Sequence, residues 1–401
     1  MKSVFTYFIS LFAAFSLAFS PVFLYANVVA QDSADRKIVV FKNYLSDEEK
    51  EAVLRDAGAQ KIKHLKTAKS SVALVDKSSE AKLLARTEIS RLDDDVLVFA
   101  LEQPSANAKG GAKPVPPQPS EVLPWGVDRV DAELVWDVVV ADLVRVAVID
   151  TGIELSHPDL KDNIKGQYNA IDNKKSANDD NGHGTHVAGT IAAIDNTIGV
   201  IGVAHKTDLL AVKVLNRNGS GFLSDIIEGI DWAVANGANV VNMSLGTVSN
   251  VQSFHDAVIR AYNSGIVLVA AAGNDYGGPV NFPAAYPEII AVSATDSNNQ
   301  IANFSSVGPE IDLAAPGVNV YSTYKGSTYK NLNGTSMATP HVAGAAALLF
   351  SVPAKCDANG DGTCSPSEIQ SKLETTAIDL GSSGKDSHYG SGLANAFAAV
   401  Q

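Results

Sequence analysis

From residue 121 to the C-terminus, apolar runs alternate with segments of helical periodicity, and no other feature restricts the fold of this chain as strongly. The apolar runs cover residues 144–149, 209–214, 240–244, 267–271 and 289–292, and the helical segments between them cover residues 185–193, 224–235 and 254–264. Strands that are apolar throughout are buried on both faces, which predicts a parallel sheet covered by helices on both sides. Ligands of such α/β sheets bind at the carboxyl ends of the strands.

Residues 36–103 show a smaller, separate pattern of strands and helices. Strands are predicted at 37–41, 71–75 and 96–101, and helices at 46–57 and 80–89. Ser46 and Glu49 have the spacing of a capping box, which marks the start of the first helix. This order of elements predicts a small α+β domain of the ferredoxin-like type. Residues 104–120 are rich in Pro, Gly and Ala, so they predict an extended linker that is open to proteolysis.

The first thirty residues have the composition of a targeting segment. Lys2 is followed by an apolar run from Val4 to about Tyr25, and then by small residues up to Ala30. This pattern predicts a secretory signal peptide that is cut after Ala26 or Ala30. The alternative is an uncleaved membrane anchor, since the run is almost long enough to span a bilayer. No later run is, so we expect a secreted extracellular or periplasmic protein without stable membrane association, in a compartment that permits disulfides.

Composition excludes several classes of protein. The formal net charge of −13 argues against a nucleic-acid partner, because phosphate binding needs a basic face. Two cysteines are too few for a disulfide-dense scaffold or a four-cysteine zinc site. The acidic excess lies after residue 108, where it forms either a solvated surface or carboxylate clusters that hold calcium.

Three short motifs carry residues that could do chemistry. Asp150 ends an apolar strand before a glycine turn, His183 lies between two glycines at a helix start, and Ser336 lies at the start of another helix. Each has an ordinary alternative: a turn-forming Asp, a polar or metal-binding His, and a Ser helix cap. There is no His-Glu-x-x-His sequence, which argues against a zinc protease.

Taken together, in the chain order Asp, His, Ser, these motifs resemble the subtilisin-like serine protease (subtilase) family. The resemblance extends over nearly all of residues 121–401, and residues 36–103 resemble the propeptide domain of that family. It implies that Ser336 is the nucleophile of an acyl-enzyme mechanism, His183 its general base and acid, and Asp150 the group that orients the histidine. The backbone N–H of Ser336 and the side chain of Asn274 would hold the oxyanion.

The resemblance also implies where substrate binds. Two edge segments would pair with an extended peptide, which requires little side-chain selectivity: Gly219-Ser220-Gly221 and Ser244-Leu245-Gly246. An upstream apolar pocket would be lined by Leu223, Ile226 and Leu245. The primary pocket would be formed by Ala272, Gly273 and Asn281, with Asp275 at its rim. Many subtilisins have Gly where this chain has Asn281, so we expect broad specificity with a shallower, more polar pocket.

A calcium site is implied by the similarity of residues 194–200 to the calcium loop of the family. Side-chain and carbonyl oxygens of the kind that calcium prefers would come from Glu121, Asp159, Ile194, Asn196, Ile198 and Val200. Glu121 stands where the family usually has Gln. The alternative is an Asn-rich surface loop.

A second calcium site is predicted from the spacing of residues 357–368 alone. Oxygen side chains recur as in a twelve-residue calcium loop, with Gly362 at the sharp turn, and the expected ligands are Asp357, Asn359, Asp361, Thr363 and Glu368. Ser365 and Glu368 also form a capping box, which is compatible with this interpretation. Cys356 and Cys364 flank the loop and are expected to form a disulfide; two free thiols are the alternative.

The chain as a whole is therefore interpreted as a secreted zymogen with calcium as cofactor. Its predicted parts are a signal peptide at 1–30, a propeptide and inhibitor domain at 31–105, a linker with the processing region at 106–120, and a peptidase domain at 121–401 with an insertion at 356–368. Self-cleavage is expected within 103–120, near Ala108 by family analogy. The product would be a monomeric endopeptidase that acts on proteins or peptides. The alternatives are a catalytically silent binding protein and a docking role for the 357–368 loop.

Overall fold

The structure is a computed structural model that describes residues 34–65, 67–102, 117–139 and 141–401. The predicted signal peptide at 1–30 and the favoured processing region around Ala108 lie outside the described residues. Within the described residues, no helix is both long and apolar enough to cross a membrane.

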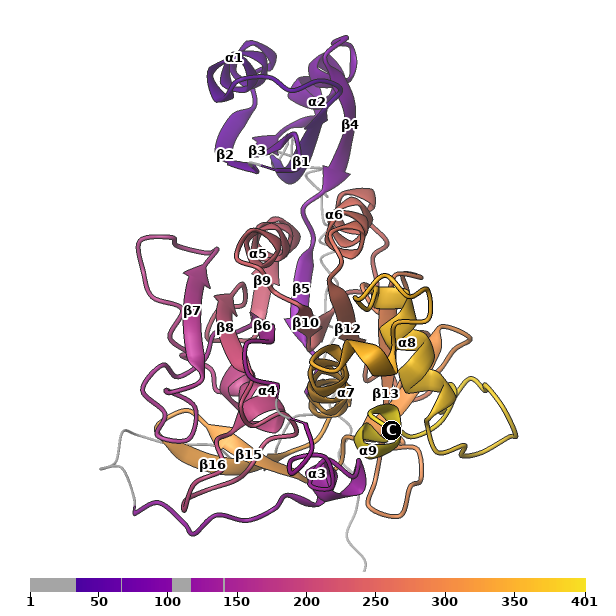
Figure 1. The fold of residues 1–401 in the computed structure, drawn as a ribbon. Helices are drawn as coiled ribbons and strands as arrows, with labels where there is room; N and C mark the ends of the chain where they lie inside the picture. Colours follow the sequence, from indigo (N-terminus) through magenta and orange to yellow (C-terminus); the bar gives the residue numbers. More distant parts are fainter. Residues whose placement is uncertain (1–33, 66, 103–116, 140) are drawn as a thin grey trace, which may run out of the picture. The chain divides into compact units, whose positions relative to one another are not determined.

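The larger domain is built on a seven-stranded sheet in which every printed pairing is parallel, as the sequence predicted. The strand order is β14 (Ile311–Pro316), β13 (Ile289–Thr295), β12 (Val267–Ala271), β10 (Val240–Met243), β6 (Arg145–Asp150), β8 (Asp208–Lys213) and β7 (Ile164–Asn169) (Figure 1). The edge strands β7 and β14 were missed. One face of β7 is exposed and its sequence is polar, so it lacks the apolar run by which the central strands were found.

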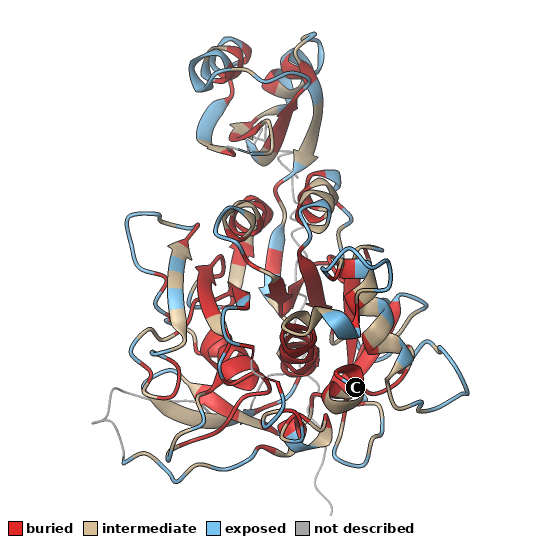
Figure 2. Ribbon diagram, viewed as in Figure 1, coloured by how far each residue is buried: buried red, intermediate tan, exposed pale blue. Residues whose placement is uncertain are grey.

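Helices cover both faces of this sheet. Alternate residues of a strand accordingly lie in two different hydrophobic cores, one on each face. Val146 and Val148 of β6 lie in one core with α4 (His183–Ala192) and α7 (Thr335–Phe350). Ala147 and Ile149 lie in the other core with α5 (Leu223–Ala235) and α6 (Gln252–Asn263). Helix α7 is buried along nearly its whole length (Figure 2). The carboxyl end of β6 and the N-termini of α4 and α7 therefore carry the three motif residues.

The small domain is a four-stranded antiparallel sheet with two helices, and the predicted ferredoxin-like fold is confirmed. Its elements are β1 (Asp35–Phe41), α1 (Asp47–Ala57), β2 (Gln60–Leu65), β3 (Ser70–Val75), α2 (Lys77–Leu84) and β4 (Ile89–Asp94), in the sheet order β2-β3-β1-β4. The capping box of Ser46 and Glu49 is present. The second helix was misplaced, because Asp76 caps it by accepting from the N–H of Ser79 and so starts it at Lys77.

The strand predicted at 96–101 is not the last strand of the small domain, and this part of the prediction was wrong. It forms β5 (Leu97–Ala100), which pairs antiparallel with β9 (Ser220–Phe222) on one side and β11 (Leu245–Gly246) on the other. Burial explains the pairing, since Val98 is fully buried in the core that contains α5 and α6. The tail of the small domain is thus a strand of the larger one.

Carboxylates from the small domain also cap two helices of the larger domain. Asp95 accepts from the backbone N–H of Ser224 (2.7 Å) at the start of α5, and Asp93 accepts from that of Ser253 (3.0 Å) at the start of α6. Within the described residues, neither helix has a side-chain cap from its own N-cap residue. A cap of this kind typically contributes about 1 kcal/mol. Lys63 adds an ion pair to Asp225 (2.5 Å).

The remaining elements follow or flank the sheet. A hairpin of β15 (Val320–Tyr324) and β16 (Thr328–Leu332) precedes α7, and α3 (Trp125–Arg129), α8 (Pro366–Thr375) and α9 (Ala396–Ala399) are short helices. After α7, a 3-10 turn at Pro353–Lys355 leads into the 356–368 insertion, where the predicted Cys356–Cys364 disulfide is present. The capping box of Ser365 and Glu368 starts α8.

Candidate active site

The side chains of Asp150 and His183 meet at the carboxyl end of β6. His183 Nδ1 lies 2.7 Å from Asp150 Oδ1 and 2.9 Å from Oδ2, and both side chains are fully buried. The N–H of Thr151 donates to Asp150 Oδ1 (2.6 Å), and the N–H groups of Val214 and Leu215 donate to the Asp150 carbonyl. Aspartate and histidine are therefore held in one arrangement by the backbone around them.

A second carboxylate, which the sequence analysis missed, organises the loop before His183. Asp179 accepts from the N–H groups of Asn181 (2.8 Å), Gly182 (2.9 Å) and Thr185 (3.0 Å). This replaces the missing cap of α4, whose N-cap residue Gly182 has φ +116°. The sequence signal was an Asp four residues before His183, since Asp commonly caps helices.

The electrostatic surroundings of His183 favour its charged form. Burial lowers the pKa of His183, but the Asp150 carboxylate, with smaller effects of Glu102 and Asp179, outweighs burial and raises this pKa to about 9. Glu102 belongs to the tail of the small domain, so the tail itself contributes to the protonation state of the histidine.

Ser336, the second residue of α7, lies beside a peptide carbonyl. Its backbone N–H donates to the carbonyl of Leu101 (3.3 Å), and Asn274 Nδ2 donates to the same oxygen (2.7 Å). Asn274 Oδ1 in turn accepts from the N–H of Thr335 (3.0 Å), which orients the amide. The Ser336 hydroxyl donates to the Ser244 carbonyl (2.9 Å), and His183 Nε2 has no hydrogen-bond partner among the described residues.

The predicted substrate edges flank β5. The Gly219 carbonyl accepts from the N–H of Ala100 (2.9 Å), and the Ser244 carbonyl accepts from that of Leu101 (3.3 Å). The residues of the predicted upstream pocket lie in the same buried cluster as Val98, and they are Leu223, Ile226 and Leu245.

The side chain of Leu101 lies beside Gly246, which adjoins Asn281 of the predicted primary pocket. A Cβ added to Gly246 would lie 2.9 Å from Leu101 Cδ1 and 3.2 Å from Asn281 Cβ. One added to Gly273 would lie 2.7 Å from Asn281 Nδ2, and the N–H of Asn281 donates to the Ala272 carbonyl. Glycine at positions 246 and 273 therefore leaves room beside Asn281 that a side chain would fill.

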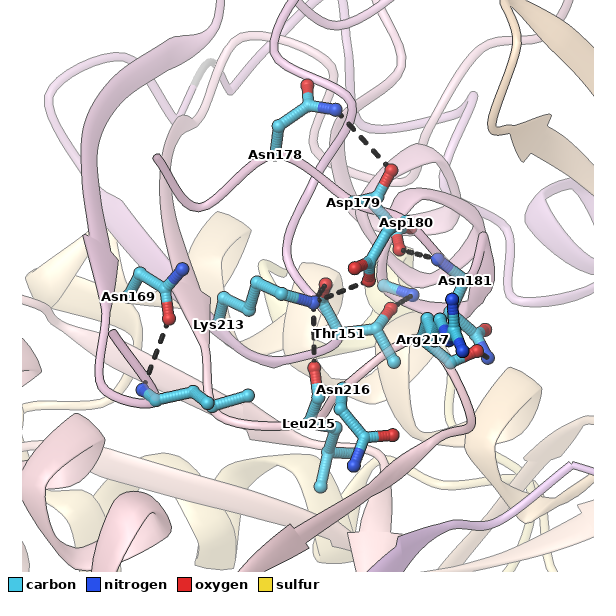
Figure 3. Close-up of polar contacts among 12 residues, drawn as sticks. Thr151, Asn169, Asn178, Asp179, Asp180, Asn181, Lys213, Leu215, Asn216 and Arg217 are labelled. Carbon is cyan, nitrogen blue, oxygen red and sulfur yellow. Dashed lines mark hydrogen bonds and ion pairs between the residues drawn. The ribbon is translucent and has the colours of Figure 1, made fainter. Parts of the chain in front are cut away.

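Lys213 connects three segments around the site, and it was also missed (Figure 3). Its side chain is 8% exposed, and Nζ donates to the Thr151 carbonyl (2.7 Å), the Leu215 carbonyl (2.8 Å) and Asp180 Oδ1 (2.7 Å). All three donors of the ammonium are thereby used. Thr151 belongs to the segment after Asp150, Leu215 to the segment before β9, and Asp180 to the loop before His183. The signal in the sequence was a lysine inside an otherwise apolar strand.

The side chains expected to hold calcium near residues 194–200 are close together. Asn196 Nδ2 donates to Asp159 Oδ1 (2.7 Å) and to the Ile194 carbonyl (3.0 Å), and the N–H of Asn196 donates to Glu121 Oε1 (2.7 Å). Burial raises the pKa of Asp159 to about 6. Asn196 Oδ1 accepts from the N–H of Ile198 (2.7 Å). The carboxylate, amide and carbonyl oxygens gathered here are of the types that calcium prefers, so this donor set fits a calcium ion. Ile198 and Val200 pair with the segment that carries Glu121.

The loop 357–368 is exposed, and its carboxylates accept from backbone N–H groups of the loop. Asp357 accepts from Gly360, Asp361 and Gly362, while Glu368 accepts from Ala358 and Asn359. Asp361 accepts from the N–H of Thr363. Among the described residues, no three His, Cys, Asp or Glu side chains converge as metal ligands. The oxygen donors suit calcium, but in this conformation they do not converge on one point.

A buried Asp–His pair, next to a serine whose N–H holds a peptide carbonyl together with an asparagine amide, is the arrangement of a serine peptidase. Comparison with known proteins agrees. The subtilase family model matches residues 142–392. The chain is 46% identical over 319 residues to the thermostable alkaline protease of Halalkalibacterium halodurans, covering 79% of this chain and 82% of that protein. It is 51% identical over 262 residues to subtilisin DY of Bacillus licheniformis (64% and 91%) and 39% identical over 405 residues to subtilisin NAT of Bacillus subtilis subsp. natto (98% of each).

The chain belongs to the subtilase family, and it is a serine endopeptidase. The resemblance noted in the sequence is thereby confirmed.

Replacing Lys213 by Met should lower kcat/KM about 10- to 100-fold, because hydrogen bonds to a charged group are worth about 1.5–3 kcal/mol each. Lys213→Arg, which keeps the charge, should retain part of the activity. Lys325→Met is the matched control, since exposed Lys325 donates only to the Asp180 carbonyl. Steady-state kinetics on the folded enzymes would measure this, and an unchanged kcat/KM in Lys213→Met would contradict it.

Replacing Glu102 by Gln should lower the pKa of His183, because one of the carboxylates that raise it is neutralised. His183 acts as a base only when neutral, so the fraction available at pH 8 should increase. ¹⁵N NMR titration of His183 in the uncut Ser336→Ala chain would measure the shift. Glu102→Asp keeps the negative charge, so the pKa of His183 should stay near its value in the chain with Glu102. Equal His183 pKa values in the Gln and Asp variants would refute the effect assigned to the Glu102 carboxylate.

Proposed function

We propose that the chain is a secreted zymogen of a calcium-stabilised serine endopeptidase with broad specificity, and that its small domain inhibits it until it is removed. The observation that carries this proposal is the position of β5. The tail of the small domain pairs with both substrate edges, and its Leu101 carbonyl accepts from Ser336 and Asn274. A substrate would bind in the same way, so the tail blocks the cleft by occupying it.

The proposed catalytic roles follow from the chemistry of the groups. The Ser336 hydroxyl must turn from the Ser244 carbonyl toward His183 Nε2, which then takes its proton as the oxygen attacks the peptide carbonyl. Asp150 would hold the Nδ1–H tautomer and stabilise the imidazolium. The N–H of Ser336 and the amide of Asn274 would stabilise the oxyanion. His183 would then protonate the leaving amine, and water would hydrolyse the acyl-enzyme.

Broad specificity is supported by the share of backbone contacts in the cleft. The tail is held mainly by main-chain pairing, which any extended peptide can make. Two side chains of the tail pack against the cleft: Val98 is fully buried in the apolar cluster, and Leu101 is half-buried beside Gly246. Phe99 between them is 49% exposed. Protein and peptide substrates with apolar residues at the positions of Val98 and Leu101 would therefore be preferred.

Inhibition by the small domain is supported by its contacts with α5 and α6. Asp93 and Asp95 cap both helices, and Arg91 pairs with Asp256 (2.5 Å). These contacts position the sheet so that β5 enters the cleft. Removal of the small domain would leave both helix N-termini to water, which can accept hydrogen bonds from their free N–H groups.

Calcium is proposed at the site of Asp159 and Asn196, where a buried carboxylate has no ion-pair partner among the described residues. A bound calcium ion would neutralise this carboxylate and tie residues 194–200 to Glu121. The 357–368 loop is proposed as a second, structural site, clamped by the Cys356–Cys364 disulfide. The predicted leader at 1–30 supports secretion.

Replacing Ser336 by Ala should abolish both casein digestion and labelling by a fluorophosphonate, because both need its hydroxyl as nucleophile. Asn274→Ala should keep the labelling site and lose about 10²–10³-fold in kcat, the range measured for one oxyanion donor in subtilisin itself. Ser297→Ala is the control, since Ser297 is exposed in the turn after β13. Labelling of Ser336→Ala at the wild-type rate would overturn the assigned nucleophile.

Chelation of calcium should lower the thermal midpoint, because an ion present at 100 times its Kd stabilises the folded state by about 2.7 kcal/mol. Differential scanning calorimetry with and without a chelator would measure the shift. Asp159→Asn should reduce that shift if the first site binds, and Asp361→Ala should reduce it if the loop binds. A midpoint that does not respond to chelation in the wild type would contradict calcium at both sites.

A further inference from the structure

A single uncut chain occupies two separate binding places of the larger domain. Its residues 97–102 lie in the cleft with Leu101 at the oxyanion donors, while residues 117–122 lie against the loop 194–200. Residues 103–116 connect them. The sequence alone favoured a cut near Ala108, within this connection. The positions of residues 97–102 and 117–122 therefore help to decide which bond is cut, and at what stage.

The register of β5 selects one peptide bond. Val98 pairs with Gly221 and is fully buried, whereas its neighbours Leu97 and Phe99 are 46% and 49% exposed. A shift by one residue would turn Val98 to solvent and bring an exposed side chain into the core, so the pairing resists slippage. With this register, Leu101 is the residue whose carbonyl reaches the oxyanion donors.

The bond from Leu101 to Glu102 is enclosed on the side of α7 as well. A Cβ added to Gly334 would lie 2.5 Å from the Leu101 carbonyl oxygen and 3.2 Å from Glu102 Cα. The absence of a side chain at Gly334 is what lets the backbone come this near to the start of α7. Glu102 is then the first residue on the leaving side, where its carboxylate acts on His183.

Residues 117–122 are held against the loop 194–200 by backbone hydrogen bonds. The N–H of Gly199 donates to the Pro119 carbonyl (2.9 Å), and that of Val122 donates back to the Gly199 carbonyl (2.9 Å). The N–H of Glu121 donates to the Thr197 carbonyl (3.2 Å). Gln118 Nε2 also donates to the Ser327 carbonyl (3.1 Å). These contacts form in the same molecule in which Leu101 occupies the cleft.

Glu102 and Pro117 are fifteen residues apart in the chain, a connection that can extend to about 50 Å. We propose that the chain cuts its own Leu101–Glu102 bond after residues 117–122 have docked on the loop 194–200, so that cutting releases the small domain without rebuilding this segment. This inference rests on the self-processing proposed above.

The cut is an ordinary acyl transfer within one chain. Ser336 Oγ would bond to the Leu101 carbonyl carbon while the bond from that carbon to the Glu102 nitrogen breaks. His183 would take the hydroxyl proton and deliver it to this nitrogen. Water would then hydrolyse the ester, which leaves a carboxylate on Leu101 and a free amine on Glu102. The new N-terminus would then lie at Glu102, upstream of the docked segment 117–122.

The bond is tested by top-down mass spectrometry of the wild-type chain during its first turnover. We expect a fragment that ends at Leu101 and a counterpart that begins at Glu102; a first fragment ending within 103–120 would overturn the assignment. Leu101→Asp should slow the first cut about tenfold or more by placing a charge in the pocket, while Ala108→Asp, the matched control, should change it less than twofold. A slow cut in Ala108→Asp and a normal one in Leu101→Asp would also overturn it. The wild-type fragment masses remain decisive if Leu101→Asp does not fold.

The order of events is tested on the uncut Ser336→Ala chain by hydrogen exchange. The N–H groups of Gly199, Glu121 and Val122 should be protected to within about twofold of their protection in the processed wild type. Protection that appears only after processing would overturn the proposed order. This measurement needs no catalysis, so it stands even if the proposed self-processing fails, and that failure would be recognised by a wild-type chain that digests casein but stays uncut.

Discussion

The candidate active site is organised around a carboxylate and an imidazole held together away from water. Asp150 and His183 are both fully buried and 2.7 Å apart. A buried charge is stable only if it is paired and hydrogen-bonded, and the N–H of Thr151 supplies part of what the aspartate needs. The ammonium of Lys213, at the parallel position of the neighbouring strand, fixes the surrounding carbonyls. The apolar strands β6 and β8 therefore end in a compact polar cluster, and the fold provides the site by ending these strands side by side.

The small domain contributes contacts that the larger domain cannot make for itself. Helices α5 and α6 begin without side-chain caps of their own among the described residues, and Asp95 and Asp93 supply them. Without β5, the short strands β9 and β11 would leave the backbone groups of their facing edges unpaired. Strand β5 pairs with both of them. Exposed strand edges readily pair with another strand, whether of the same chain or of a substrate. Under the proposed function, inhibition and substrate binding would be two uses of one pairing surface.

Much of this arrangement was accessible from the sequence, for reasons that differ between its parts. The central strands were found because both their faces are buried, which leaves continuous apolar runs. Strand β7 was not found because its exposed face carries polar residues, and β14 was not found because Asp312 interrupts its short apolar run, although all its residues are buried. The motif residues Asp150, His183 and Ser336 were found because glycines and helix starts surround them. Lys213 and Asp179 were missed, because a buried lysine or aspartate is recognised only by its partners, and those lie far away in the chain.

The sequence by itself determined the alternating α/β pattern, the order of the three motif residues, the family, and the residue types available at each site. Only the tertiary structure decided that residues 97–100 form a strand of the larger domain and that Leu101, upstream of the favoured linker, presents its carbonyl to Ser336 and Asn274. Local sequence specifies that a segment is extended, but its register is set by which side chain is buried, here Val98, against residues more than a hundred positions away. That burial exists only once the distant segments have packed together.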